Sequence, residues 1–307
     1  MGLCKYKKDG MTMENYVLSC CSTVDLSEEH LAKRNIHYLC FHFTLGDKEY
    51  PDDLGKSVPF NKFYKAMSDG LPTKTSQVNV VEYVDYFTKF LEKGLDIVHV
   101  TLSSGLSGTY NSASLAREML LEQFPDRHIY IIDSLGASSG SGLFMEYLAD
   151  LRDSGMSAED LYGWALDHRL NLNHWFFSTD LTYYVRGGRI SKAAGWFGTA
   201  LKICPLLNMN DEGKLIPRYK LRGKRAVIKR IVEKMVECAD GGREYNGKCF
   251  ISHSDCLEDA LAVKNLVLET FPNLNGDVLI NSIGTTIGSH TGPGTVALFF
   301  MGAKRER

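Results

Sequence analysis

The sequence predicts an α/β protein of two domains, and three observations support this class. The chain has 307 residues, a length that suits one large domain or two ordinary ones. Its first half alternates short apolar runs with amphipathic segments, a pattern typical of a three-layer α/β/α domain with a parallel sheet. Its second half adds a hairpin to strand and helix units, which predicts a two-layer α/β domain with a mixed sheet. We place the boundary near Gly155, so that the domains are residues 1–155 and 156–307.

Hydrophobic periodicity assigns the elements of the first half. Near-continuous apolar runs that end in small polar residues predict strands, and apolar residues three and four apart predict helices. The predicted strands are residues 15–21, 38–46, 96–103 and 128–134. The predicted helices are residues 26–34, 78–94, 107–124 and 141–155. Each predicted strand is followed by a predicted helix, which is why we expect the sheet to be parallel.

The second half shows a different order of elements. The predicted helices are residues 157–170, 224–239 and 256–271. The predicted strands are residues 174–179, 248–254, 277–283 and 295–302, together with two strands within 205–222 around a tight turn at 211–213. A hairpin beside strand and helix units predicts a mixed sheet with helices on one face.

The composition is that of a soluble globular protein, with 44% hydrophobic and 23% charged residues. A net charge of −2 argues against nucleic-acid binding by the chain as a whole. The chain has no apolar run of about 18 residues, and residues 1–16 lack the apolar core of a secretory signal. None of the eight cysteines forms a C-x-x-C pair, so we expect no metal, and their place in apolar runs favours a reducing, cytoplasmic compartment.

Three predicted strands of the first half end in small polar loops, at residues 22–25, 103–109 and 134–142. In parallel α/β sheets, ligands bind beyond the carboxyl ends of the strands, so three converging loops indicate a binding site. Serine and glycine there expose backbone N–H groups at helix N-termini, which favours an anion. Few cations accompany them, which fits a carboxylate or a single phosphate. The alternative is that each loop only caps a helix.

Two further polar segments are candidates for the same site. Thr75 and Ser76 precede the predicted helix at 78–94, where they would bind a ligand or simply cap the helix. His290 stands among glycines and a proline before the last strand, and we interpret this segment as a loop that exposes the ring. A histidine in a loop is often only a surface residue, so both interpretations stay open.

A serine hydrolase is the alternative function that the sequence offers. Residues 136–140 read GASSG, which matches G-x-S-x-G with Ser138 in the nucleophile position, and His290 and Asp255 would complete a triad. Two residues separate the motif from its strand, although a nucleophile elbow turns directly off the strand. No HGGG-like oxyanion loop precedes it. We therefore rank this interpretation below ligand binding.

Two basic segments suggest acidic partners. Residues 214–230 contain eight basic residues and no acid, and residues 186–192 carry Arg186, Arg189 and Lys192 on a glycine-rich turn. A solvated hairpin and helix face would also explain the first segment. Arginine on a turn suits recognition of a carboxylate or phosphate. Nucleic acid is less favoured, because aromatic residues are not interleaved with the basic ones.

Four motifs in order make the chain similar to a known family. They are TLSSGLSGTYNSA (101–113), IDSLGASSGSG (132–142), YYVRGGRIS (183–191) and IGSHTGPGTVALFF (287–300). These resemble the signature motifs of the DegV family, bacterial proteins that bind fatty acids. The resemblance runs from Asn15 to Met301. It implies two α/β domains with a long-chain fatty acid between them, and a carrier without catalytic activity or cofactor.

The resemblance also implies a partner and a set of site residues. Several members act as the acyl-carrier subunit of a bacterial fatty acid kinase and present the carboxylate to a separate ATP-binding subunit, for which the basic segment 214–230 is the candidate docking surface. The residues carried over by motif are Thr75, Ser104 and His290 for the carboxylate, Ser103 beside them, and Arg189 at the domain interface. Candidates for an apolar tunnel are Phe177, Trp196, Phe197 and Ile203.

The chain departs from the family pattern at two positions. The first family motif reads D-S-T-x-D-L, and this chain has Cys21 where that motif begins with Asp. The family also tends to have proline after T-S-Q, where this chain has Val78. Any role of the first carboxylate is therefore lost or moved here.

Overall fold

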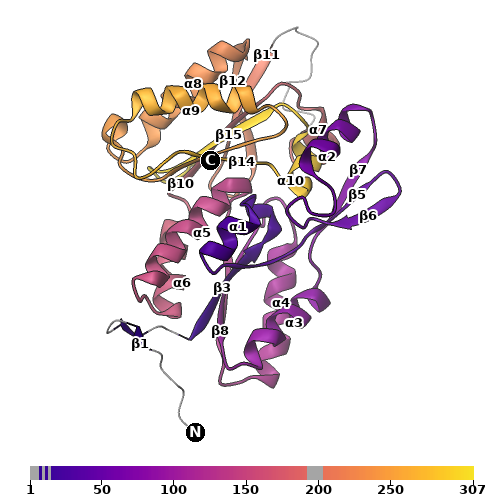
Figure 1. Cartoon of the computed structure of the whole chain (residues 1–307), viewed down its shortest axis with the longest axis vertical. Helices are drawn as coiled ribbons and strands as arrows, with labels where there is room; N and C mark the ends of the chain where they lie inside the picture. Colours follow the sequence, from indigo (N-terminus) through magenta and orange to yellow (C-terminus); the bar gives the residue numbers. More distant parts are fainter. Residues whose placement is uncertain (1–6, 9–10, 13–14, 192–202) are drawn as a thin grey trace.

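The computed structural model describes residues 7–8, 11–12, 15–191 and 203–307. The parallel sheet occupies one end of the molecule and the mixed sheet the other (Figure 1). The tunnel candidates Trp196 and Phe197 lie outside the described residues. No helix within the described ranges is long and apolar enough to cross a membrane.

The first half contains the predicted three-layer α/β/α arrangement. Its parallel strands, in spatial order, are β4 (His37–Leu39), β3 (Tyr16–Cys21), β8 (Asp96–Thr101) and β9 (Ile129–Asp133). One face packs on α1 (Glu28–Lys33), α5 (Ser138–Asp153) and α6 (Ala158–His168), and the other on α3 (Val80–Leu91) and α4 (Thr109–Gln123). Because side chains alternate along a strand, Leu18 and Cys20 join the first layer, while Val17 and Cys21 join the second.

A small antiparallel sheet interrupts this pattern, and here one prediction was wrong. Residues 38–46 are not one strand: β4 ends at Leu39, and the chain then enters another sheet. That sheet has the order β6 (Lys48–Pro51), β5 (His42–Leu45) and β7 (Thr73–Ser76), covered by α2 (Phe60–Ser68). The break arises because Phe41 leaves the ladder: its N–H donates to Ser22 Oγ and its carbonyl accepts from the Asp52 N–H.

The second half forms the predicted mixed sheet. Its order is β12 (Leu215–Arg222), β11 (Ile203–Met209), β10 (Leu172–Ser178), β15 (Thr295–Met301), β13 (Cys249–His253) and β14 (Leu279–Ser282). Only the β13–β14 pair is parallel. One face packs on α8 (Lys224–Cys238) and α9 (Leu257–Thr270). The shorter elements are β1 (Lys7–Lys8), β2 (Met11–Thr12), η1 (Ser22–Val24), α7 (Thr182–Arg186), η3 (Gly242–Glu244) and α10 (Thr285–Thr291).

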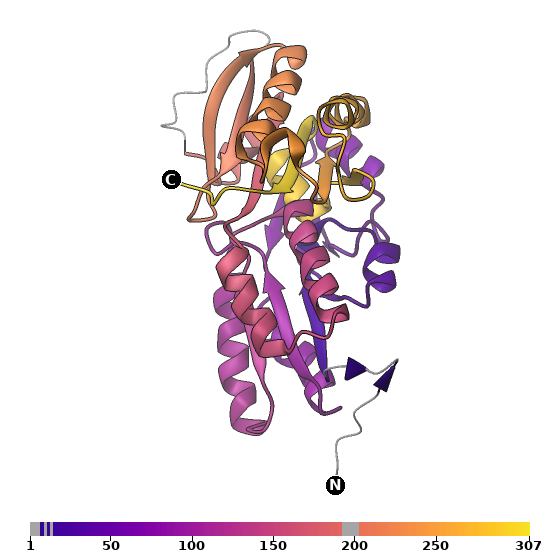
Figure 2. The ribbon, with the colours of Figure 1, turned by 90° about the vertical axis from the view of Figure 1, so that its left-hand side faces the viewer.

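Helix α5 joins the two halves, because it lies between the parallel sheet and the mixed sheet (Figure 2). Phe176 and Phe299, on the inner face of the mixed sheet, share one core cluster with Phe144 of α5. Phe177 points to the opposite face and packs with α8 and α9. The small sheet of the first half lies beside α10 of the second half, so the two halves are in contact (Figure 1). The domain boundary near Gly155 therefore stays a prediction.

Candidate functional site

A cavity of about 510 Å³ lies between the two halves. This volume is within the roughly 300–1,000 Å³ typical of small-molecule sites. Most of its wall is apolar, and the apolar residues that line it are Phe41, Leu102, Leu106, Ala137, Phe176, Met209, Leu215, Ile283, Ile287, Ala297 and Phe299. They come from both halves, so neither half encloses the cavity alone. A ligand that fills it must be largely apolar, because polar groups facing this wall would lose their hydrogen bonds to water.

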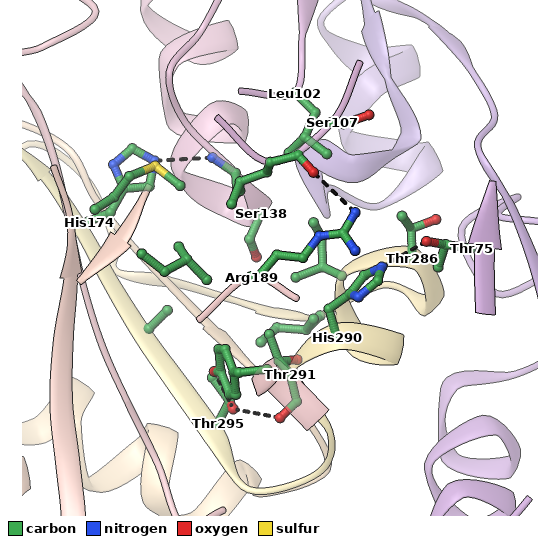
Figure 3. Close-up of a pocket in the computed structure, with 18 of the residues that line it drawn as sticks. Thr75, Leu102, Ser107, Ser138, His174, Arg189, Thr286, His290, Thr291 and Thr295 are labelled. Carbon is green, nitrogen blue, oxygen red and sulfur yellow. Dashed lines mark hydrogen bonds between the residues drawn. The ribbon is translucent and has the colours of Figure 1, made fainter. Parts of the chain in front are cut away.

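Polar side chains gather at one side of the cavity (Figure 3). Thr75 of β7 and His290 of α10 are joined by a hydrogen bond of 2.7 Å between Oγ1 and Nε2. Arg189 follows α7 and donates through Nη1 to the Gly187 carbonyl and through Nη2 to the Leu106 carbonyl. No acidic side chain pairs with Arg189 among the described residues. The guanidinium therefore leaves a net positive charge beside the cavity, which favours an anionic ligand group.

The His290 ring is neutral at neutral pH. Burial, and then the positive charge of Arg189, lower the pKa of His290 from its usual value to about 4. A neutral ring next to Thr75 can orient the threonine hydroxyl without forming a tight ion pair with an anion. His290 thus supplies hydrogen-bond geometry to the site, and Arg189 supplies the charge.

Two buried polar atoms on the cavity wall have no partner. His290 Nδ1 and Thr291 Oγ1 make no hydrogen bond with any described residue. Thr286 differs, because its side chain faces the Asp52 carboxyl: burial raises the pKa of Asp52, and the Thr286 hydroxyl acts against that rise. An unpaired buried polar group costs about 1–3 kcal/mol, so these two atoms favour a polar group at this side of the cavity.

The structure separates the predicted serines from the cavity. Ser103 is buried, but its hydroxyl donates to the Gly213 carbonyl at 2.8 Å and does not line the cavity. Ser104 is exposed, and its backbone N–H donates to Asp133. Ser107 of the same loop lines the cavity instead. The loop at residues 103–109 therefore has two roles. Ser103 at its start binds the turn between β11 and β12, and Ser107 further along lines the cavity.

Two local predictions need correction. Thr75 and Ser76 lie in strand β7 and do not cap a helix, because Asn79 caps α3 through a capping box with Glu82. His290 is not in an exposed loop. It lies in the last turn of α10, which ends at Gly292, so the glycines and proline mark the end of a short helix.

His174 is a cavity residue that the sequence did not indicate. It lies across the cavity from Arg189 (Figure 3), where its Nε2 accepts from the Ala137 N–H. Burial lowers the pKa of His174 well below its usual value. A methyl group on Gly140 would lie 2.3 Å from His174 Nε2. The glycines of the GASSG motif therefore make room for this ring, which no local pattern in an apolar strand could reveal.

Ser138 lines the cavity, and its hydrogen bonds to described residues are to a carboxyl and a serine. Its φ is +56°, and its hydroxyl donates to Asp25 Oδ2 at 2.5 Å and is hydrogen-bonded to Ser252 Oγ at 3.0 Å. His290 is engaged with Thr75, and no hydrogen bond joins Ser138 to a histidine within the described ranges. The Ser138 proton is committed to a carboxyl group, which does not activate it as a nucleophile.

Cys21, which stands where the DegV motif has Asp, lies away from the cavity. Its Sγ is 3.3 Å from Tyr83 Oη and 3.7 Å from His99 Nε2, and all three side chains are buried. Burial raises the pKa of the Cys21 thiol to about 11. The thiol is therefore a neutral part of the core. No group of three or more His, Cys, Asp or Glu among the described residues could hold a metal ion.

The low pKa of His290 predicts a pH dependence of stability. The unfolded chain takes up a proton near pH 6.5, whereas the folded ring does so only near pH 4. The free energy of unfolding should therefore fall as the pH drops through this window, by about 1.4 kcal/mol per pH unit from this residue. Urea titrations of apo protein at several pH values should show a shallower slope in His290→Gln. The exposed His128→Gln is the control, and an equal slope change there would contradict the assignment.

Comparisons with known proteins agree with this architecture. The family model of the DegV family, described as uncharacterised proteins, matches residues 21–303. A DegV domain-containing protein of Clostridium perfringens is 36% identical over 294 residues, which cover 96% of this chain and 100% of the relative. A Thermotoga maritima protein whose structure is described as revealing a fatty acid binding function is 26% identical, with a TM-score of 0.81 over 94% of this chain and 99% of that one.

A third neighbour shares the fold at lower identity. The Streptococcus pneumoniae fatty acid kinase (Fak) B3 protein, loaded with linoleic acid, is 22% identical, with a TM-score of 0.80 over 94% of this chain and 99% of that chain. The family model matches residues 21–303, and the four ordered motifs and the two sheets joined through α5 are consistent with that match. This protein therefore belongs to the DegV family.

Proposed function

We propose that this protein binds a long-chain fatty acid in the cavity between its two halves and acts as a carrier rather than an enzyme. One observation carries the proposal. At one side of an apolar cavity of about 510 Å³ lie Arg189, which forms no salt bridge with a described acidic residue, and polar atoms without a hydrogen-bond partner. A fatty acid has the matching form, with one anionic group on an apolar chain. The fatty acid binding described for the Thermotoga maritima relative supports the same ligand class.

The head group would lie against Thr75, His290 and Arg189. With Nε2 protonated, His290 donates to Thr75 Oγ1, and the threonine hydroxyl is then free to donate to a carboxylate oxygen. Arg189 supplies charge from a side chain already held by two carbonyls, so little side-chain entropy is lost on binding. Ser103 and Ser104 support the surrounding loop in this proposal, and Ser107 replaces them at the cavity wall.

The acyl chain would supply most of the affinity. Burial contributes about 0.8 kcal/mol per CH₂, so a sixteen-carbon chain gains on the order of 10 kcal/mol before the costs of association. The carboxylate then selects the ligand and fixes its direction. A ligand held this tightly is expected to remain bound through purification.

Mass spectrometry tests the proposal directly. Native spectra of purified protein should show an added mass that disappears on denaturation, and solvent extraction should recover a fatty acid in about one-to-one ratio. An empty protein that also takes up no added palmitate or oleate would overturn the proposal. The recovered mass would report chain length and unsaturation.

We further propose that the carrier presents its carboxylate to an ATP-binding kinase subunit, which docks on the basic segment 214–230. Much of that segment's charge is already paired within the chain, and the basic residues that contact Glu or Asp are Lys214, Lys224, Lys229 and Arg230. Arg222 and Arg225 pair with no acidic side chain among the described residues and are the better docking candidates.

The docking proposal predicts that charge reversal in the basic segment prevents phosphorylation of the fatty acid without affecting its binding. Arg222→Glu with Arg225→Glu should abolish acyl phosphate formation by kinase subunit and ATP, because reversed charges repel an acidic partner surface. The bound fatty acid content should stay unchanged. Lys48→Glu on exposed β6 is the control. Equal acyl phosphate yields from all variants would remove this segment from the interface.

The hydrolase alternative makes the opposite prediction for Ser138. We expect a fluorophosphonate probe to leave Ser138 unlabelled, because its hydroxyl donates to Asp25 and meets no histidine among the described residues. Labelling would be measured by fluorescence in gel against Ser138→Ala. Labelling of the wild type that is lost in Ser138→Ala would favour the hydrolase instead.

A cytoplasmic location is part of the same proposal. Seven of the eight cysteines lie in the described residues, and all seven are free. Four of the seven are buried, and free buried thiols are typical of proteins kept in a reducing compartment.

A further inference from the structure

The first turn of α10 is tied to the first half of the chain by two buried carboxyl groups. Asp25 Oδ1 accepts from the Gly284 N–H at 2.9 Å, and Asp52 Oδ1 accepts from Thr285 Oγ1 at 2.7 Å. Asp25 is 4% exposed and Asp52 is 1% exposed. No cation pairs with either carboxyl in the described part of the chain. Carboxyl groups buried without a cation are uncommon, so a specific role is expected for them.

The second oxygen of each carboxyl contacts the wall around the cavity. Asp25 Oδ2 accepts from Ser138, which lines the cavity. Asp52 Oδ2 accepts from Ser22 Oγ at 3.2 Å, and Ser22 in turn holds the chain where it enters the small sheet that carries Thr75. Each carboxyl thus links the start of α10 to a segment that faces the ligand.

Helix α10 depends on such contacts for its position. It has seven residues, which is too short for a helix to be stable by itself. It lies between Gly284 and Gly292, which constrain the chain little. Thr286 directly follows the tethered Thr285, and His290 lies one turn further on, so a shift at the first turn moves both into or away from the site.

We propose that Asp25 and Asp52 are positioning residues for the head-group site: their hydrogen bonds to Gly284 and Thr285 set where α10 places Thr286 and His290 opposite Thr75 and Arg189. The inference rests on the proposed function, since it assigns these carboxyls to carboxylate recognition. They do not contact the ligand themselves. They determine how well the cavity distinguishes a carboxylate from a neutral head group.

The experiment compares palmitate with 1-hexadecanol, which share the chain and differ in the head group. Dissociation constants are measured for delipidated wild type, Thr285→Val, Asp25→Ala and Asp52→Ala. We expect palmitate affinity to fall about tenfold in Thr285→Val, the effect of one lost buried hydrogen bond, and at least as much in the alanine variants, each of which loses two, with hexadecanol affinity unchanged. Ser289→Ala is the control, because among the described residues that hydroxyl donates only to the Thr285 carbonyl within α10.

Conservative variants separate positioning from general stability. Burial raises the pKa of both carboxyls, so a neutral amide of the same shape is a fair substitute. Asp25→Asn and Asp52→Asn should keep the wild-type preference for palmitate. If the alanine variants do not fold, the test rests on Thr285→Val. This substitution keeps the shape of the side chain and removes only its hydroxyl group.

Two results would overturn the inference. The first is a folded Thr285→Val with the wild-type preference for palmitate. The second is an equal loss of palmitate and hexadecanol affinity, which would indicate only general damage to the cavity. A wild type that binds neither ligand would instead contradict the proposed function, and the inference with it. These patterns differ, so the two failures are distinguishable.

Discussion

Replacing Gly292 with alanine should destabilise the protein by roughly 3 kcal/mol or more. Gly292 ends α10 with φ +68° and ψ 179°, a conformation that is essentially restricted to glycine and costs another residue about 1–3 kcal/mol. An added Cβ would also lie 2.1 Å from Cδ2 of the Tyr183 ring, and overpacking typically costs a further 1–3 kcal/mol. Chemical denaturation followed by circular dichroism would measure the loss.

The effect should extend to ligand binding, because α10 carries His290. Tyr183 must move to admit the methyl group, and it packs against the core of the small sheet that carries Thr75. Gly163→Ala is the matched control, since an added Cβ there meets no atom within 4 Å in an exposed part of α6. That variant should be as stable as the wild type or slightly more so. Equal stability of Gly292→Ala and wild type would refute the account of this turn.

Replacing Arg189 with glutamine should weaken fatty acid binding by roughly 10–100-fold. Hydrogen bonds to a charged group contribute about 1.5–3 kcal/mol, and Arg189 is the charged group on the cavity wall. Affinity for the matching fatty alcohol should be nearly unchanged, because the alcohol has no charge to lose. Titration calorimetry of delipidated protein with palmitate and 1-hexadecanol would measure both.

Arg186→Gln provides a control from the same turn. Arg186 is exposed and lies over the Tyr183 ring, 5.5 Å from its centroid, and it does not line the cavity. Its removal should leave both affinities unchanged. Parallel losses in the two arginine variants would indicate only a general field of positive charge, and no loss in Arg189→Gln would place the carboxylate elsewhere.

Most of the architecture was predictable because it depends on the spacing of apolar residues along each strand and helix. In β3, side chains alternate between two helix layers, and such a strand leaves a clear apolar run. The break at Phe41 was not predictable, since it depends on hydrogen bonds to Ser22 and Asp52, which lie far away or in loops. An apolar run shows that a segment is buried and extended, but not to which sheet it belongs.

The candidate site was predictable to the level of segments. The motifs indicated Thr75, His290 and Arg189, and the structure places these three on one cavity wall. The sequence could not show which hydroxyl of the loop at 103–109 lines the cavity, because a loop has no period that tells which side chain faces inward. The burial of Asp25 was also not predictable, since an acid in a short polar loop is usually a surface residue.

The Thr75–His290 hydrogen bond joins residues 215 positions apart in the chain. At a synthesis rate of about 5–20 residues per second, the ribosome needs roughly 10–40 seconds to travel from one to the other. The nascent chain can fold its parallel sheet in that interval, but the polar side of the cavity does not yet exist. Under the proposed function, a fatty acid can therefore bind there only after both segments have been made.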